Sequence, residues 1–304
     1  MWTAGWGYSR SNQAFSKKTH ARKSDFGHNE LTLCLHRFIG LPMKHGLSGF
    51  SLAIALSLLV TGCVTERTYS GTDIPVSERK LDKVAAARER MQLGLTYLNR
   101  GNSEQAKYNL DKAIEYAPEL EDVHVAMAYY YQTVGDLVRT EQAYQDAINT
   151  KDASGDSMNN FGVFLCQQKQ YEKAEKMFLA AIEMPKYTRT ASSYENLGLC
   201  SRDAGRAEKA RQYFQMALKY DPRRSVSLLE LVELGIDKGD YVDARNQLAR
   251  YHQVAAQTPE SLTLGIKIEQ ALNDDAAMKR FGILLLAKFP ASPQAKQYRV
   301  NLHQ

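Results

Sequence analysis

The sequence predicts an all-α fold built from repeated helical hairpins, and three observations carry this prediction. The chain of 304 residues has only 8 prolines, and alanine, leucine, glutamate, lysine and glutamine, which favour helix, are common. One pattern of large and small residues recurs with a period close to 34 residues. Glycines (Gly101, Gly135, Gly205) and prolines (Pro118, Pro222) recur at places where helices would have to end.

A large residue followed by a small one marks each repeat. The pairs are Leu93-Gly94, Met127-Ala128, Phe161-Gly162 and Leu197-Gly198, at steps of 34, 34 and 36 residues. The small residue lets the second helix of a hairpin approach the first one closely, and large residues fill the space between repeats. Gly101, Gly135 and Gly205 stand where the first helix of a hairpin must stop, because glycine adopts the left-handed conformation at low cost.

This pattern resembles the tetratricopeptide repeat, a unit of two antiparallel helices. Two weaker units follow, around Gly239-Asp240 and Leu264-Gly265. We therefore expect about six helix-turn-helix repeats, arranged as a right-handed superhelix with a concave groove. The last unit is degenerate, as expected of a terminal repeat with one solvent face.

An apolar segment near the N-terminus resembles the signal peptide of a bacterial lipoprotein. It begins at Met43-Lys44-His45, continues as an apolar run from Leu47 to Val60 and ends on Val60-Thr61-Gly62-Cys63. The run is shorter than the ~20 apolar residues of a comfortable transmembrane span. The last four residues resemble a lipobox, in which the cysteine thiol receives the lipid, so we expect lipidation at Cys63. The alternative is a plain signal peptide or a membrane helix with an incidental cysteine.

This leader divides the chain into four parts. The expected divisions are 1–42 as an extension, 43–62 as the signal peptide, 63–82 as the lipidated cysteine with a flexible tether, and 83–304 as the helical domain. The extension lies upstream of a complete signal peptide, so we expect Met43 to be the true start and the extension to come from an incorrectly assigned start codon. Val64, not aspartate, follows Cys63. In bacterial lipoproteins that residue is compatible with an outer-membrane, periplasm-facing location.

The net charge of +5 comes from the leader. The whole chain has 39 Lys and Arg and 34 Asp and Glu, and residues 1–62 hold seven of the basic and two of the acidic residues. From Cys63 onward, 32 residues of each sign remain, so that part is neutral. A nucleic-acid-binding protein needs a positive face to neutralise phosphates, so we expect no nucleic-acid partner.

The sequence offers no catalytic constellation, which predicts that the protein is not an enzyme. It contains no Gly-rich phosphate loop, no HExxH and no GxSxG motif. The histidines after the lipobox, His124, His252 and His303, are too dispersed to suggest a metal site. Gly155-Asp156-Ser157 falls at the start of the third repeat, where we expect a helix-capping role. We therefore expect no cofactor and no metal.

Two of the four cysteines form a candidate disulfide. Cys34 lies in the extension and Cys63 in the lipobox, which leaves Cys166 and Cys200, one repeat apart. Both fall on the first helix of their unit, in neighbouring units three and four. An oxidising periplasm favours a disulfide between such a pair. The alternative is two small buried residues.

The inner face of the first helices is the candidate partner-binding groove. In units one and two the candidates are Met91, Leu95, Leu98, Asn99, Val125, Tyr129 and Gln132. In units three and four they are Asn159, Val163, Gln167, Glu195, Leu199, Arg202 and Asp203. The groove is thus expected to be apolar at its membrane-proximal end and polar further along. An exposed apolar stripe indicates a partner site, although the same side chains could merely pack against their neighbours.

From Met43 to the C-terminus the chain resembles the PilF/PilW family of type IV pilus biogenesis and stability lipoproteins. The most telling stretches are residues 85–118, AAARERMQLGLTYLNRGNSEQAKYNLDKAIEYAP, and residues 159–178, NNFGVFLCQQKQYEKAEKMF. The resemblance implies a pilotin that travels by the outer-membrane lipoprotein trafficking machinery and binds a segment of the secretin subunit, aiding insertion and multimerisation of the secretin. The competing hypothesis is a lipid-anchored periplasmic adaptor for a cell-wall enzyme or a protease, because this fold hosts many partners.

Overall fold

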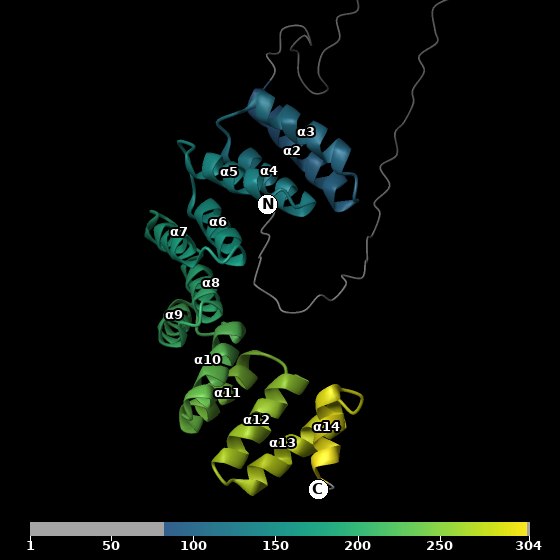
Figure 1. Cartoon of the computed structure of the whole chain (residues 1–304), viewed down its shortest axis with the longest axis vertical. Helices are drawn as coiled ribbons and strands as arrows, with labels where there is room; N and C mark the ends of the chain where they lie inside the picture. Colours follow the sequence, from purple (N-terminus) through teal and green to yellow (C-terminus); the bar gives the residue numbers. More distant parts are fainter. Residues whose placement is uncertain (1–81, 303–304) are drawn as a thin grey trace, which may run out of the picture. The chain divides into compact units, whose positions relative to one another are not determined.

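The structure is a computed structural model that describes residues 82–302, which form thirteen α-helices and no strand (Figure 1). The helices are α2 (Lys83–Asn99), α3 (Ser103–Tyr116), α4 (Glu121–Val134), α5 (Leu137–Ile148), α6 (Gly155–Gln167), α7 (Tyr171–Glu183), α8 (Thr190–Asp203), α9 (Ala207–Tyr220), α10 (Ser225–Lys238), α11 (Tyr241–Val254), α12 (Pro259–Ala271), α13 (Asp275–Lys288) and α14 (Pro293–Leu302). The predicted extension, signal peptide, lipobox and tether lie outside the described residues.

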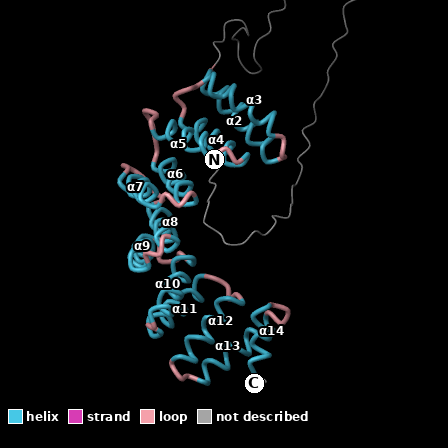
Figure 2. Tube along the Cα trace, in the orientation of Figure 1, coloured by secondary structure: helices cyan, strands magenta, loops and turns pink. Residues whose placement is uncertain are grey.

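Consecutive helices pair into six hairpins, from α2 with α3 to α12 with α13, and the closest packing of each helix is with its hairpin partner. Each hairpin then packs on the next one along the chain, with short loops between the helices (Figure 2). We call the first helix of each hairpin the A helix and the second the B helix. The predicted all-α architecture of six helix-turn-helix units is confirmed.

In four repeats a glycine of the A helix (Gly94, Gly162, Gly198 or Gly265) lies against a large side chain of the B helix. A Cβ atom added to Gly162 would lie 2.8 Å from a ring carbon of Phe178, and one added to Gly198 would lie 2.6 Å from a ring carbon of Phe214. Real Cβ atoms do not approach other atoms so closely, so glycine is what allows these helices to pack at this distance. The role predicted for the small residues is confirmed at these positions.

The turn between the A and B helices needs a left-handed residue in all six hairpins. Four turns use glycine, at Gly101, Gly135, Gly205 and Gly239, where φ lies between 74° and 82°. The other two use Lys169, with φ 59°, and Asn273, with φ 57°. Asparagine tolerates this conformation better than most side chains, but lysine adopts it at a cost of roughly 1 kcal/mol. The third hairpin therefore has a strained turn.

A half-buried carboxylate connects the second hairpin to the third. A carboxylate oxygen of Glu121, at the start of α4, accepts hydrogen bonds from the backbone N–H (2.7 Å) and the hydroxyl (2.8 Å) of Ser154, and a further one from the Ser157 hydroxyl. Ser154 also caps α6, which begins at Gly155. The Gly155-Asp156-Ser157 sequence thus lies at a helix start, as expected, and its serine serves the contact between hairpins.

The C-terminal helix α14 was not expected from the sequence, which predicted only a degenerate sixth repeat. It packs on both α12 and α13, and Ala295 of α14 joins Leu262 and Leu285 in a small core. Its start has recognisable signals, because the Ser292 hydroxyl accepts a hydrogen bond from the Ala295 N–H at 3.1 Å and Pro293 is the first helical residue. This helix covers the apolar end that the last hairpin would otherwise leave exposed.

Between residues 82 and 302, none of the helices combines the length and the apolar character that crossing a membrane requires.

Lys169→Gly should stabilise the fold by about 0.5–1 kcal/mol, because glycine adopts the positive φ of this turn without the steric cost of a side chain. The measurement is the free energy of unfolding from a denaturant titration. Gln168→Gly is the matched control, since the preceding residue has φ −82° and gains nothing from glycine. The control should destabilise, and stabilisation of both variants alike would contradict the assignment of strain to Lys169.

Candidate partner-binding face

Five of the seven predicted groove residues of repeats one and two are at least partly exposed. Asn99 is exposed at the end of α2, and Leu95, Val125, Tyr129 and Gln132 are half-buried on α2 and α4. Leu95 rests against the core, so part of its surface supports the fold and part faces solvent. These residues come from two neighbouring A helices that pack on one another.

Met91 and Leu98 are buried, and their assignment to the groove was wrong. Met91 is 8% exposed and belongs to the core cluster that contains Leu110 and Val123, while Leu98 is 5% exposed. Residues at i, i+4 and i+7 form one stripe on a helix, and an apolar stripe is the pattern of a core face as much as of a binding face. The spacing of these residues therefore could not show that Met91 and Leu98 are buried whereas Leu95 is partly accessible.

Three candidates in repeats three and four are also buried and form contacts between hairpins. Asn159 accepts hydrogen bonds from the Ser193 hydroxyl (2.9 Å) and the Asn196 amide (3.1 Å) of α8. Glu195 and Leu199 are 4% and 5% exposed. Their side chains stabilise the repeat array and are not accessible to a partner.

The Glu195 carboxylate is held by the next hairpin. It accepts hydrogen bonds from the backbone N–H (3.1 Å) and the hydroxyl (2.8 Å) of Ser227 and pairs with the Arg224 guanidinium at 2.5 Å. A buried carboxylate is tolerated only when it is paired and hydrogen-bonded in this way. Sequence spacing gave no sign that this residue faces the neighbouring helix instead of solvent.

The accessible residues continue onto α6 through a pair of amides. The Gln132 amide of α4 donates a hydrogen bond to the side-chain oxygen of Gln167 on α6 at 3.0 Å. Val163, one turn before Gln167, is half-buried against the same core as Leu95. We call this set of uncharged residues the A-helix face: Leu95, Asn99, Val125, Tyr129, Gln132, Val163 and Gln167. Half-buried apolar side chains beside amides suit the binding of a polypeptide, whose backbone offers donors and acceptors.

The corresponding parts of α8 and α10 have charged side chains instead of uncharged ones. The Arg202 guanidinium pairs with Glu233 at 3.0 Å and also with Glu230. The sequence named Arg202 and Asp203 but missed the acidic residues of the fifth repeat, Glu230 and Glu233. A step of 34 residues, the same as from Gly205 to Gly239, leads from Leu199 to Glu233 but does not reach Glu230 from any candidate.

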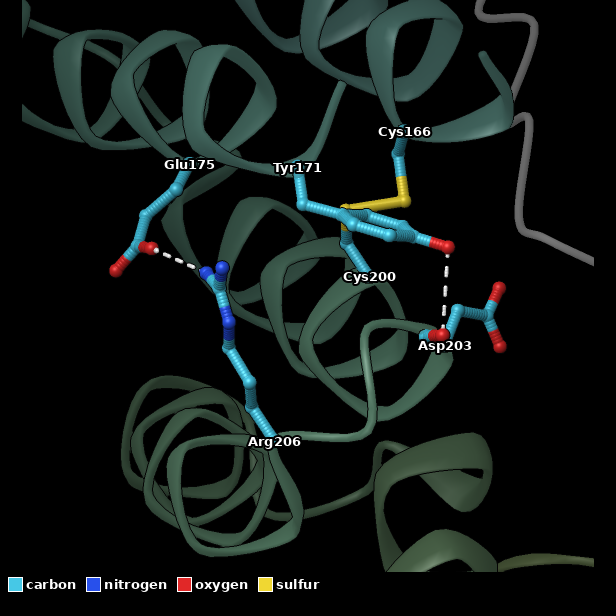
Figure 3. The surroundings of a disulfide bond; sticks show 6 residues. All are labelled: Cys166, Tyr171, Glu175, Cys200, Asp203 and Arg206. Atoms are coloured by element: carbon cyan, nitrogen blue, oxygen red, sulfur yellow. Dashed lines mark hydrogen bonds and ion pairs between the residues drawn. A yellow bond between two sulfur atoms is a disulfide. The ribbon is translucent and has the colours of Figure 1, made fainter. Parts of the chain in front are cut away.

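A disulfide joins α6 to α8. The sequence placed Cys166 and Cys200 on the first helices of the third and fourth units, and both lie there. Their sulfur atoms are bonded, with the two Cα atoms 5.8 Å apart. Figure 3 shows the Tyr171 ring beside the bond, and the Tyr171 hydroxyl donates to the backbone carbonyl of Asp203 at 3.3 Å. The covalent link thus fixes the A helices of the two neighbouring hairpins.

An ionic network surrounds Glu175 on the B-helix side of the disulfide (Figure 3). The Glu175 carboxylate pairs with Lys209 at 2.9 Å and Arg206 at 3.5 Å, and accepts a hydrogen bond from the Tyr213 hydroxyl at 2.7 Å. Burial acts to raise the pKa of Glu175, but the Tyr213 hydroxyl and the Lys209 ammonium outweigh it, so the pKa lies below its ordinary value. Burial and the carboxylate together raise the pKa of Tyr213. The network links α7 to α9.

The described part of the chain has no cluster of three or more His, Cys, Asp or Glu side chains that could hold a metal ion.

The fold and its face define a tetratricopeptide-repeat protein. Family models described as tetratricopeptide repeat match residues 90–120 and 154–223. The chain is 32% identical over 251 residues to the type IV pilus assembly protein PilF of Pseudomonas aeruginosa. The aligned residues make up 83% of this chain and 98% of that protein.

Solved structures show the same relationship. The structure of Pseudomonas aeruginosa PilF matches with a TM-score of 0.61 and 31% identity, covering 73% of this chain and all of that one. The crystal structure of PilW, a type IV pilus biogenesis factor, matches with a TM-score of 0.58 and 25% identity over 69% of this chain and 97% of that one. The chain belongs to the PilF/PilW family of tetratricopeptide-repeat proteins of type IV pilus biogenesis.

Replacing both Cys166 and Cys200 by serine should lower the free energy of unfolding by about 3–4 kcal/mol, the loop-closure entropy expected for a crosslink across 34 residues of sequence. Denaturant titration with and without reductant measures this. Reductant should destabilise the wild type and leave the double variant unchanged. Equal thiol titration of the denatured wild type with and without prior reduction would rule the bond out.

Proposed function

We propose that the protein is an outer-membrane lipoprotein that binds the type IV pilus secretin subunit and supports the targeting and multimerisation of the secretin. Membership of the PilF/PilW family carries this proposal, because the similarity to PilF extends over nearly the whole of that protein. The lipobox at Cys63 supports the membrane anchor, with delivery by the outer-membrane lipoprotein trafficking machinery.

The A-helix face supplies the binding surface in this proposal. Its apolar part, formed by Leu95, Val125 and Tyr129, holds a segment of the secretin subunit, and the amides of Gln132 and Gln167 hydrogen-bond the backbone of that segment. Binding alone then promotes multimerisation of the secretin, because a subunit held at the membrane meets other subunits at a higher effective concentration.

Deleting the gene separates this proposal from the periplasmic-adaptor alternative. Loss of secretin multimers on an immunoblot, together with loss of surface pili, is the expected result. Normal secretin multimers with altered cell shape or lysis would instead favour an adaptor for a cell-wall enzyme or a protease. Cys63→Ser tests the anchor separately, because it should release the protein from the membrane fraction while the folded domain is retained.

Leu95→Glu and Tyr129→Ala should abolish capture of the secretin subunit in a pull-down, because the first places a charge in the apolar face and the second removes its largest side chain. Circular dichroism should stay unchanged, since both residues are partly exposed. Val138→Ala is the control, because this apolar residue is 82% exposed on the B helix α5. Wild-type capture by both face variants would refute the assignment of the face.

A further inference from the structure

The A-helix side of the array changes from uncharged to acidic between repeats three and four. The A-helix face on α2, α4 and α6 consists of uncharged residues, whereas α8 and α10 present Arg202, Asp203, Glu230, Glu233 and Asp237. The exposed cation of α10, Lys238, is paired with Glu208 of α9. Four carboxylates thus accompany one guanidinium. A surface with this balance has a negative potential that attracts basic groups and repels acidic ones.

Two of these carboxylates, on Asp203 and Asp237, make no ion pair within the described residues. Arg202 is already shared between Glu230 and Glu233. Asp203 and Asp237 are exposed. Asp237 lies one turn after Glu233 on the same side of α10. Figure 3 shows the Asp203 side chain directed away from the disulfide, while its backbone carbonyl contacts Tyr171.

The acidic surface directly adjoins the uncharged one. Gln167, the last residue of the A-helix face, follows Cys166 in the sequence, and the Cα of Cys166 lies 5.8 Å from that of Cys200 on α8. Arg202 and Asp203 complete the same helix. One segment of a partner can therefore contact both surfaces without leaving the array.

We propose that the partner segment is an extended polypeptide with apolar residues on repeats one to three and lysine or arginine residues on repeats four and five. This rests on the proposed function, in which the A-helix face binds a polypeptide, and it adds the chemistry of that polypeptide. Charge complementarity carries the argument, because basic side chains would neutralise Asp203 and Asp237 and extend the pairing begun by Arg202.

The spacing of the A helices sets the form and length of the segment. Packed helices lie about 8–10 Å apart, and three residues of polyproline II conformation span about 9 Å and return to the same side. Each A helix would then contact one residue of the segment, and the contacting residues would lie three apart in the sequence of the segment. Four steps from α2 to α10 then correspond to a segment of about 11–13 residues.

The test uses two fluorescein-labelled peptides of about 12 residues whose sequences favour the polyproline II conformation. In both peptides one half has leucine at every third position, to contact the uncharged A-helix face. The other half contains arginine in the first peptide and glutamate in the second, and each peptide is made in both chain directions. Fluorescence anisotropy with the full chain at low salt measures the affinities. The arginine peptide should bind at least about fivefold more tightly than the glutamate peptide, and added salt should reduce the difference.

Asp203→Asn with Asp237→Asn should remove most of this preference and leave circular dichroism unchanged, because both side chains are exposed and unpaired. The matched control is Glu119→Gln with Asp152→Asn, two exposed acids in the loops that precede α4 and α6, which should keep the preference because they lie at helix starts, whereas Asp203 and Asp237 lie at helix ends. A preference that persists in the first variant would overturn the inference.

The outcomes separate this inference from the proposed function. If both peptides bind equally and Tyr129→Ala abolishes both interactions, the charge preference is overturned and the binding face is retained. If neither peptide binds, the inference is also overturned, while capture of the secretin subunit continues to test the proposed function by itself.

Discussion

A single helical hairpin has too little apolar surface to be stable alone, so this fold depends on how closely its two helices approach and on what the next hairpin covers. The contact of Gly198 with the Phe214 ring, repeated in other hairpins, sets the first distance. Packing of the two helices against each other still leaves one apolar side of each hairpin exposed to solvent. The following hairpin covers that side, and α14 covers the last one. Order in any repeat therefore depends on its neighbours.

The same constraint produces the binding face. Because each hairpin packs on the next one, the A helices follow one another along the array, and a surface is built from one or two residues of each repeat. The buried contact of Asn159 with Ser193 lies about one helical turn from the accessible Val163 and about two turns from Gln167. One helix thus carries both the links between repeats and the residues available to a partner, so a change in one readily affects the other.

Repetition also decides what the sequence could predict. The hairpins were predictable because the large-small pair and the turn glycine recur, and each occurrence supports the others. Helix α14 occurs once, and its only signals are the Ser292 cap and Pro293, which are local and weak alone. The burial of Met91 and Leu98 was not predictable from one helix, because it depends on how a neighbouring helix covers the stripe. Lys169 was missed, although it stands 34 residues after Gly135, because the third repeat has no glycine there to mark the turn.

The disulfide lies where the hydrophobic core changes from one cluster to the next. On α8, Leu197 and Cys200 belong to the cluster shared with the first three repeats, whereas Leu199 belongs to the cluster of the later repeats. A single helix therefore connects two cores, and apolar packing by itself constrains this junction less than one continuous core would. The bond from Cys166 to Cys200 fixes α8 against α6 at this place. The uncharged and the acidic surfaces also meet at this junction. The disulfide therefore fixes their relative position before a partner that contacts both surfaces binds. Alignment before binding lowers the entropy lost on association, and in this way a crosslink away from the contacting side chains favours binding.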